Sequence, residues 1–317
     1  MSSTQEIKRR IKAVTNTGQI TKAMEMVSAT KMRRSQEIAL LSRPYAIQVL
    51  RLLSELSRRT PYTPQIMRHR PVNKTAIVLV TSDRGLAGAF NTNVFRAFDK
   101  KIRQEINDKN KYAFIAVGKK AEEYLSRERL PLAKSFKNFG DYIEVGQIKP
   151  LTELLIHGFL RADWDRVIAV STHFRSTLRQ DVLVREVLPV ASERVLETIR
   201  EIVPERGRFA GFGLLEGEIF GAEHHFGNYQ YLIEPNPKRV LDELAPQLVT
   251  IELYDLILEA NAGEHSARMV AMKNASENAL ELKDELSLDY NKLRQAGITR
   301  EITEIVGGAE ALQATSH

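Results

Sequence analysis

The sequence predicts an α/β domain of Rossmann-like type inserted between two long terminal helices. Each end of the chain has a long run without proline in which apolar residues recur every three or four positions, the spacing of one helix face. Between these runs, short apolar segments alternate with helical patterns, which is typical of a parallel sheet. We therefore expect helices over residues 1–60 and 240–306, paired as an antiparallel coiled coil, and an α/β domain over 72–236.

The C-terminal helix has the clearest pattern, because residues 247–306 contain no proline. At 1.5 Å per residue, a helix of this length would reach roughly 90 Å, about three times the diameter of a small domain. Most of it must stand outside a globular core, so its apolar stripe needs a partner. The stripe consists of Leu248, Ile251, Leu258, Ala262, Met269, Met272, Ala279, Leu286, Tyr290 and Leu293.

The partner is expected at the other end of the chain, where residues 5–43 also lack proline. Charge favours the pairing: residues 1–60 hold 12 Lys/Arg against 4 Asp/Glu, net +8, and residues 244–306 hold 6 against 11, net −5. The surplus positive charge predicts an acidic partner surface. The N-terminal stripe comprises Ile7, Ile11, Val14, Ile20, Met24, Val27, Met32 and Ile38, and continues through Tyr45, Val49, Leu52 and Leu56.

The sequence between the terminal helices predicts alternating strands and helices. Strands are expected at 74–82, 112–117 and 165–171, with an edge strand at 178–188 and a last strand at 229–234. Helices are expected at 91–107, 119–128 and 148–160. The segment 191–228 fits neither pattern, and we interpret it as an insertion: a helix that breaks at Pro204, followed by a glycine-rich stretch.

Composition and charge exclude several classes of function. The chain has 317 residues and no cysteine, which excludes disulfides and thiol chemistry. No apolar run approaches a membrane span, and the basic residues 8–12 are followed by polar ones, so neither a transmembrane helix nor a signal peptide is expected. No aromatic residues are interleaved among the basic residues 8–34, so we expect a solvated helical face or an acidic protein partner, and no nucleic acid.

Residues 82–91 (SDRGLAGAFN) form the most enzyme-like stretch, because a glycine-bearing turn before a helix can hold an anion. The stretch matches no phosphate-loop motif, and a tight strand-to-helix turn is the favoured interpretation. His224 and His225 have no further metal ligands in view, and no acid/base pair is visible. We expect no catalytic centre, cofactor or metal. From the residues alone, an independent coiled-coil scaffold and a small α/β nucleotide enzyme with helical extensions both stay open.

Several stretches together resemble one family, over nearly the whole chain and in the right order. They closely resemble the gamma subunit of F-type ATP synthase, the central-stalk rotor of its F1 sector. The stretches are 7–11 (IKRRI), 20–34 (ITKAMEMVSATKMRR), 82–88 (SDRGLAG), 267–275 (ARMVAMKNA) and 291–305 (NKLRQAGITREITEI).

The resemblance implies a non-catalytic subunit. In that family the terminal helices form a coiled coil inside a ring of alternating alpha and beta subunits, and the α/β domain lies against the epsilon subunit and the membrane c-ring. Rotation couples proton flow to ATP synthesis on the beta subunits and regulates ATPase activity. The implied location is peripheral, at the cytoplasmic side of a bacterial cell membrane.

The resemblance also implies the residues that contact the ring. Met24 matches the position where the rotor meets an acidic beta-subunit loop, and Arg33 and Arg34 add to the basic face presented to that loop. Four further residues match positions that form a polar catch with the ring or hold the coiled coil: Arg268, Gln295, Thr299 and Glu304. Photosynthetic members carry a regulatory insertion where 191–228 lies. Without cysteine, thiol regulation is excluded, and our hypothesis is that the segment restrains wasteful ATP hydrolysis.

Overall fold

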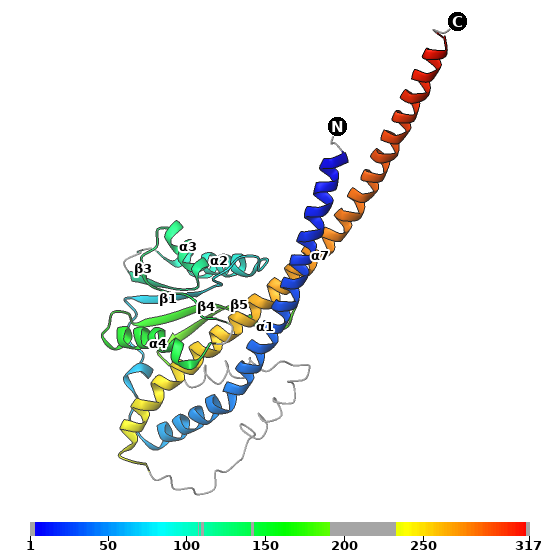
Figure 1. Ribbon diagram of the computed structural model, residues 1–317. Coiled ribbons are helices and arrows are strands. Elements are labelled where there is room, and N and C mark those ends of the chain that lie inside the picture. Colours follow the sequence, from blue (N-terminus) through cyan, green and yellow to red (C-terminus); the bar gives the residue numbers. More distant parts are fainter. Residues whose placement is uncertain (1–3, 107, 109–110, 141–142, 191–232, 315–317) are drawn as a thin grey trace. The chain divides into compact units, whose positions relative to one another are not determined.

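The computed structural model describes residues 4–106, 108, 111–140, 143–190 and 233–314 (Figure 1). The insertion 191–228 and most of the strand predicted at 229–234 lie outside the described residues, and the described Ile233 and Glu234 are not in a strand. The chain divides into two compact units. The first comprises Met1–Val27 and Met269–His317, and the second is Ser28–Arg268. The domain boundaries expected at 60, 72 and 240 stay a prediction.

Two long helices dominate both units, as the terminal periodicity predicts. Helix α1 runs Thr4–Arg59 and continues through Pro44. Helix α7 runs Pro237–Ala314 and continues through Pro246, so it starts before the predicted residue 240. A proline inside a helix removes one backbone hydrogen bond. Here the turns on both sides of Pro246 are anchored by apolar side chains that are 0% exposed, those of Leu241, Ala245 and Leu248.

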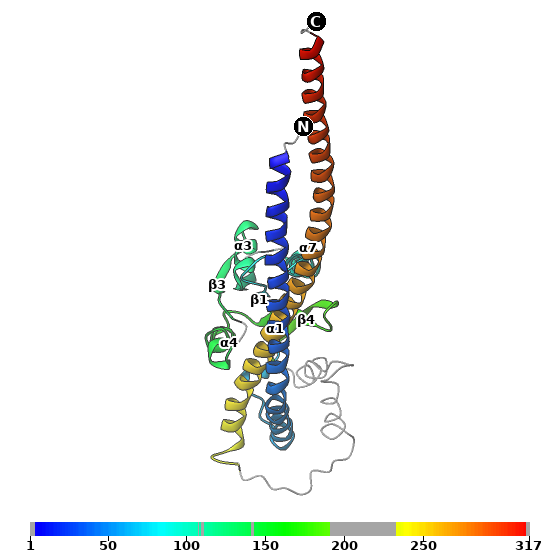
Figure 2. The same cartoon turned by 45° about the vertical axis from the view of Figure 1, so that its right-hand side comes forward.

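The two helices pair antiparallel, which confirms the predicted arrangement. In the second unit, Ser42 Oγ donates to Asp255 Oδ1 at 2.9 Å and Tyr45 Oη donates to Gln247 Oε1 at 2.7 Å. In the first unit, a Cβ built on Gly18 would lie 3.4 Å from Ala279 Cβ. Within each unit the two helices lie side by side in both views (Figure 2).

A five-stranded sheet in the order β3-β2-β1-β4-β5 forms the centre of the second unit. The first four strands are parallel, and the edge strand β5 is antiparallel to β4, so the Rossmann-like α/β class is confirmed. The strands are β1 Thr75–Val80, β2 Tyr112–Val117, β3 Leu132–Phe136, β4 Arg166–Phe174 and β5 Gln180–Leu188.

Among the strands of the described residues, β3 is the one that the sequence pattern did not predict. It has five residues, follows Pro131, and its burial pattern contains no fully buried position. A short edge strand with an exposed lysine, here Lys134, avoids edge-to-edge pairing and shows little apolar alternation.

Helices cover both faces of the sheet. Helices α2 (Phe90–Lys101) and α3 (Lys119–Arg127) pack on one face, where Ile77, Phe98 and Phe114 are 0% exposed. Helix α4 (Val145–Leu160) and α7 cover the other face (Figure 1). The helix predicted at 91–107 ends earlier, at Lys101, and a 3₁₀ turn follows at Arg103–Glu105. In the described part of the chain, no helix combines the length and apolar character that crossing a bilayer requires.

A buried carboxylate ties the start of β4 to the segment before β1. Asp165 Oδ2 accepts the backbone N–H groups of Asn73 and Lys74 at 2.9 and 3.0 Å, and Arg70 Nε lies 2.6 Å from Oδ1 without hydrogen-bond geometry. Burial opposes ionisation, but the two N–H donors and the Arg70 charge outweigh it, so the pKa of Asp165 lies below its ordinary value.

We expect Asp165→Asn to lower the free energy of unfolding by about 2 kcal/mol at pH 7. A depressed native pKa means that the stabilisation is fully present above the unfolded-state pKa of about 3.9 and is lost as pH falls through the native value. Urea unfolding followed by circular dichroism should therefore show the gap between native and variant proteins narrowing below about pH 4. A gap that stays constant from neutral to acid pH would contradict this assignment.

Candidate interaction surface

The described C-terminal end of α7 presents an apolar stripe to solvent. Every residue from 291 to 307 is exposed. Ile298, Ile302 and Ile305, here called the C-terminal stripe, are 49%, 55% and 71% exposed and share one helix face through their spacing of four and three. Apolar residues gathered on an exposed helix face are typical of a protein docking surface.

Three residues assigned to the ring contact lie in this same stretch. Gln295 and Thr299 are one turn apart and exposed, and the Thr299 hydroxyl donates to the Gln295 carbonyl at 3.0 Å. Glu304 is also exposed, but it lies about two and a half turns from Gln295 and therefore on the opposite side of the helix. The structure thus brings Gln295 and Thr299 together, and places Glu304 apart from them.

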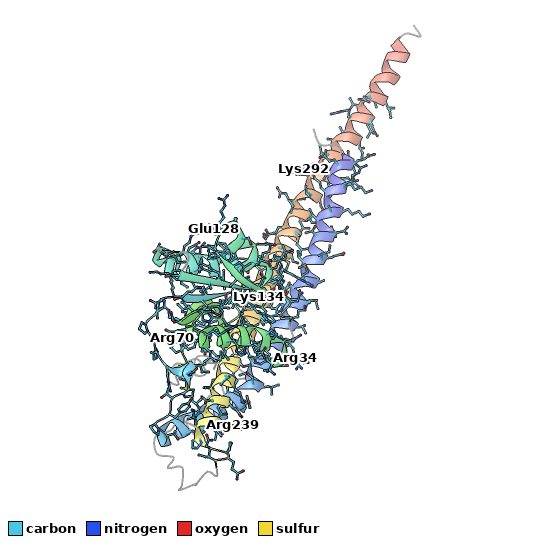
Figure 3. The ribbon with its side chains drawn as sticks, turned by 90° about the vertical axis from the view of Figure 1, so that its left-hand side faces the viewer. Arg34, Arg70, Glu128, Lys134, Arg239 and Lys292 are labelled. Carbon is cyan, nitrogen blue, oxygen red and sulfur yellow. The ribbon has the colours of Figure 1, made fainter. Side chains whose placement is uncertain are left out.

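The N-terminal candidates lie on α1. Met24 is half-buried within the first unit. Arg33 and Arg34 are exposed in the second unit, and Arg34 Nη1 forms an ion pair with Glu37 Oε2 at 3.2 Å. Figure 3 shows Arg34 on the side of α1 away from the sheet. An exposed pair of this kind contributes little to stability, so Arg34 stays available for an acidic partner.

Arg268 differs from the other six candidates because it is 8% exposed and engaged within its own unit. Its Nη2 donates to Gly85 O at 3.2 Å and to Glu264 Oε1 at 2.6 Å, and its Nη1 lies 3.3 Å from His265 Nδ1. Arg268 therefore joins α7 to the loop after β1. Its role in the polar catch or in holding the coiled coil stays a prediction.

The turn at residues 82–91 is held by its own polar groups. Ser82 Oγ donates to Arg84 O at 2.7 Å, and Asn91 Nδ2 donates to Ser82 Oγ at 2.7 Å. The Asp83 carboxylate accepts the backbone N–H groups of Lys119 and Asn138, both at 2.8 Å. The first of these donors, Lys119, begins α3. The geometry favours the tight-turn interpretation over a phosphate loop.

Sequence reasoning missed a set of buried charges. Glu252, Asp255 and Glu259 of α7 are 4%, 2% and 5% exposed. Glu259 Oε2 lies 2.9 Å from His173 Nδ1 and 3.7 Å from Arg185 Nη1. The sequence does contain a sign of this set: the three acidic residues are three and four positions apart, so they lie on one face of an otherwise apolar helical run.

Comparisons with known proteins identify the family. The pattern of a family described as ATP synthase matches residues 3–312. An ATP synthase gamma chain from Roseiflexus castenholzii is 39% identical over 320 residues, which is 98% of this chain and 99% of that one. The chain belongs to the ATP synthase gamma chain family. Another ATP synthase gamma chain, from Moorella thermoacetica, is 36% identical over 314 residues, covering 99% of this chain and all of that one.

Solved structures agree with the fold of an ATP synthase gamma chain. A chain of the Euglena gracilis mitochondrial ATP synthase (OSCP/F1/c-ring) superposes with a TM-score of 0.63 at 19% identity, over 99% of this chain and 96% of that one. A chain of the Tetrahymena thermophila mitochondrial ATP synthase central stalk and c-ring gives 0.54 at 24% identity, over 81% and 99%. At these identities the likeness establishes the fold alone. The resemblance to the gamma family and the predicted fold class are both confirmed.

Proposed function

We propose that this gamma subunit is the central-stalk rotor of the F1 sector and turns inside a ring of three alpha and three beta subunits. The observation that carries the proposal is the exposed end of α7 with its C-terminal stripe. A helix end that carries exposed isoleucines on one face is suited to contact the apolar inner surface of a surrounding ring of subunits. The independent-scaffold alternative is not favoured, because gamma chains match the sequence over nearly its full length.

In this proposal the chain supplies asymmetry and the beta subunits supply the chemistry. Exposed Arg33 and Arg34 make one surface of α1 basic, whereas the C-terminal stripe is apolar. A ring subunit that contacts the basic surface gains a different contact free energy from one that contacts the C-terminal stripe. Only such a difference in contact free energy can shift the equilibrium between the conformations of a ring subunit. Rotation would then change nucleotide affinity in each beta subunit in turn, and so couple transmembrane proton flow to ATP synthesis.

The proposed ring contacts fall into two groups. Met24, Arg33 and Arg34 would face acidic beta-subunit loops, and their position on the strongly basic N-terminal helix supports this. Gln295, Thr299 and Glu304 would contribute to the polar catch, and their exposure supports this.

The remaining partners would meet the α/β domain. In the proposal, the epsilon subunit and the membrane c-ring bind there, which makes the chain peripheral to the membrane, at the cytoplasmic side of a bacterial cell. The insertion 191–228 would restrain ATP hydrolysis. Deleting it should raise ATPase activity and weaken inhibition by ADP, and unchanged values of both would remove the hypothesis.

Reconstitution tests the proposal. The purified chain, mixed with alpha and beta subunits from the same organism, is expected to restore ATP hydrolysis and to elute in a complex with one copy per three alpha/beta pairs. Self-association of the isolated chain without assembly would favour the scaffold. Nucleotide binding by the isolated chain would favour the enzyme alternative.

A further inference from the structure

The sheet of the α/β domain has a topological switch point at its carboxyl edge. From β1 the chain passes through β2 to β3 on one side, and then crosses back to β4 on the other side of β1. In open α/β sheets, the crevice outside the strand ends at such a point is where ligands bind. The crevice here lies between the ends of β1 and β4.

Helix α7 packs against the carboxyl end of β4 at this point. Glu259 Oε2 lies 2.9 Å from Nδ1 of His173, the penultimate residue of β4. One turn further along α7, a Cβ built on Gly263 would lie 3.1 Å from Thr172 Cγ2 and 3.5 Å from Phe90 Cε2. Glycine therefore permits the helix to approach β4 and the start of α2 closely.

The loops that follow the parallel strands hold the same part of α7. Arg268 Nη2 donates to Gly85 O, in the loop after β1. Every residue of α7 from 251 to 263 is buried, and α7 passes beside the sheet in both cartoon views (Figure 1, Figure 2). Three more hydrogen bonds reach the loops after β3 and β4: Tyr254 Oη to Ile143 O at 3.1 Å, Asn261 Nδ2 to Gly140 O at 3.2 Å and Ser266 Oγ to Thr177 O at 2.8 Å.

We propose that residues 251–268 of α7 fill the switch-point crevice as an intramolecular ligand, and that this contact is a rigid clamp that transmits torque between the α/β domain and α7. The inference rests on the proposed rotor function. Polar bonds to three separate loops resist both sliding and rolling of the helix, and buried charge contacts are stronger than exposed ones because the surroundings are less polarisable. Gly263, Glu259 and Arg268 are the positioning residues.

A disulfide lock tests whether the clamp is rigid. The Cβ built on Gly263 lies 3.7 Å from Thr172 Cβ, within the range of about 3.5–4.5 Å that a disulfide requires. Thr172→Cys with Gly263→Cys should cross-link on oxidation, since the chain has no other cysteine. In the membrane-bound ATP synthase, proton-driven ATP synthesis should be the same within about twofold before and after reduction. Failure to cross-link, or synthesis that stops in the locked form, would overturn the rigid clamp.

A wedge variant tests whether the clamp carries torque. Gly263→Val should push α7 away from Thr172 and Phe90, whereas the control Gly146→Val in α4 places its side chain in open space. We expect Gly263→Val to lower proton pumping per ATP hydrolysed by about fivefold or more, with hydrolysis by the detached F1 complex kept within about twofold. Pumping and hydrolysis that fall in parallel, or that both stay unchanged, would contradict the clamp.

These outcomes are distinct from a failure of the rotor function itself. If the native chain supports neither assembly nor hydrolysis with the ring subunits, the proposed function fails. If the native chain supports both, and only the lock or wedge result differs from expectation, the clamp fails while the rotor function stands.

Discussion

Replacing Ile298, Ile302 and Ile305 together by aspartate is expected to prevent assembly with the alpha/beta ring without unfolding the isolated chain. All three side chains are already about half exposed or more, so the fold loses little. Burying an isoleucine contributes about 1.5–3 kcal/mol, so three of them account for at least about a hundredfold in affinity, and buried aspartates would weaken binding further. Co-elution with the ring subunits and restored ATP hydrolysis are the measurements.

A second triple variant controls for the added charge. Val72, Leu160 and Leu178 are 49%, 42% and 84% exposed and belong to the unit that contains the α/β domain. Replacing them by aspartate adds the same charge at exposed apolar positions outside the C-terminal stripe. This control should assemble normally with alpha and beta subunits. If both triple variants assemble as the native chain does, the stripe is not the ring contact.

Glu259→Ala is expected to destabilise the α/β domain by about 3–5 kcal/mol, because it leaves two partners in the interior without their carboxylate. These partners are His173, which is 2% exposed, and Arg185, whose side chain is 11% exposed. Trp164 is the single tryptophan and is buried in this domain, so its fluorescence during urea unfolding reports the loss.

Two further variants make the Glu259 result specific. Glu281→Ala removes an exposed carboxylate from the same helix and should change stability by less than about 0.5 kcal/mol. Glu259→Leu combined with His173→Leu replaces the polar pair by apolar groups, and should cost less than Glu259→Ala alone. Equal losses for Glu259→Ala and Glu281→Ala would show that the buried contact contributes nothing.

Regular patterns made most of the fold predictable from the sequence. The apolar spacing of the terminal helices and the apolar runs of β1, β2 and β4 reflect local rules, so the predicted and observed bounds of β2 coincide at Tyr112–Val117. The C-terminal helix starts at Pro237, earlier than the predicted residue 240, and runs through Pro246 because tertiary packing compensates for the lost backbone hydrogen bond. Strand β3 escaped notice because a short exposed edge strand shows no such pattern.

The candidate contacts were predictable only as far as family motifs extend. The resemblance assigns Arg268 to a catch or a coiled-coil contact, which stays a prediction, but no motif predicts its bond to Gly85, 183 residues away in the sequence. Likewise, nothing local in the sequence links Glu259 to His173, which is 86 residues away. Partners at such separations are set by the topology of the sheet. Gln295, Thr299 and Glu304 stay predictions, because their partner is another protein.

Direct observation of rotation tests the central claim. Lys134 is exposed on β3 (Figure 3), and because the chain has no cysteine, Lys134→Cys gives a single thiol for attaching a bead. With the alpha/beta ring fixed to a surface and ATP supplied, we predict that the bead turns in one direction and stops when ATP is exhausted. Continued ATP hydrolysis with a stationary bead would contradict the assignment of this chain as the rotor.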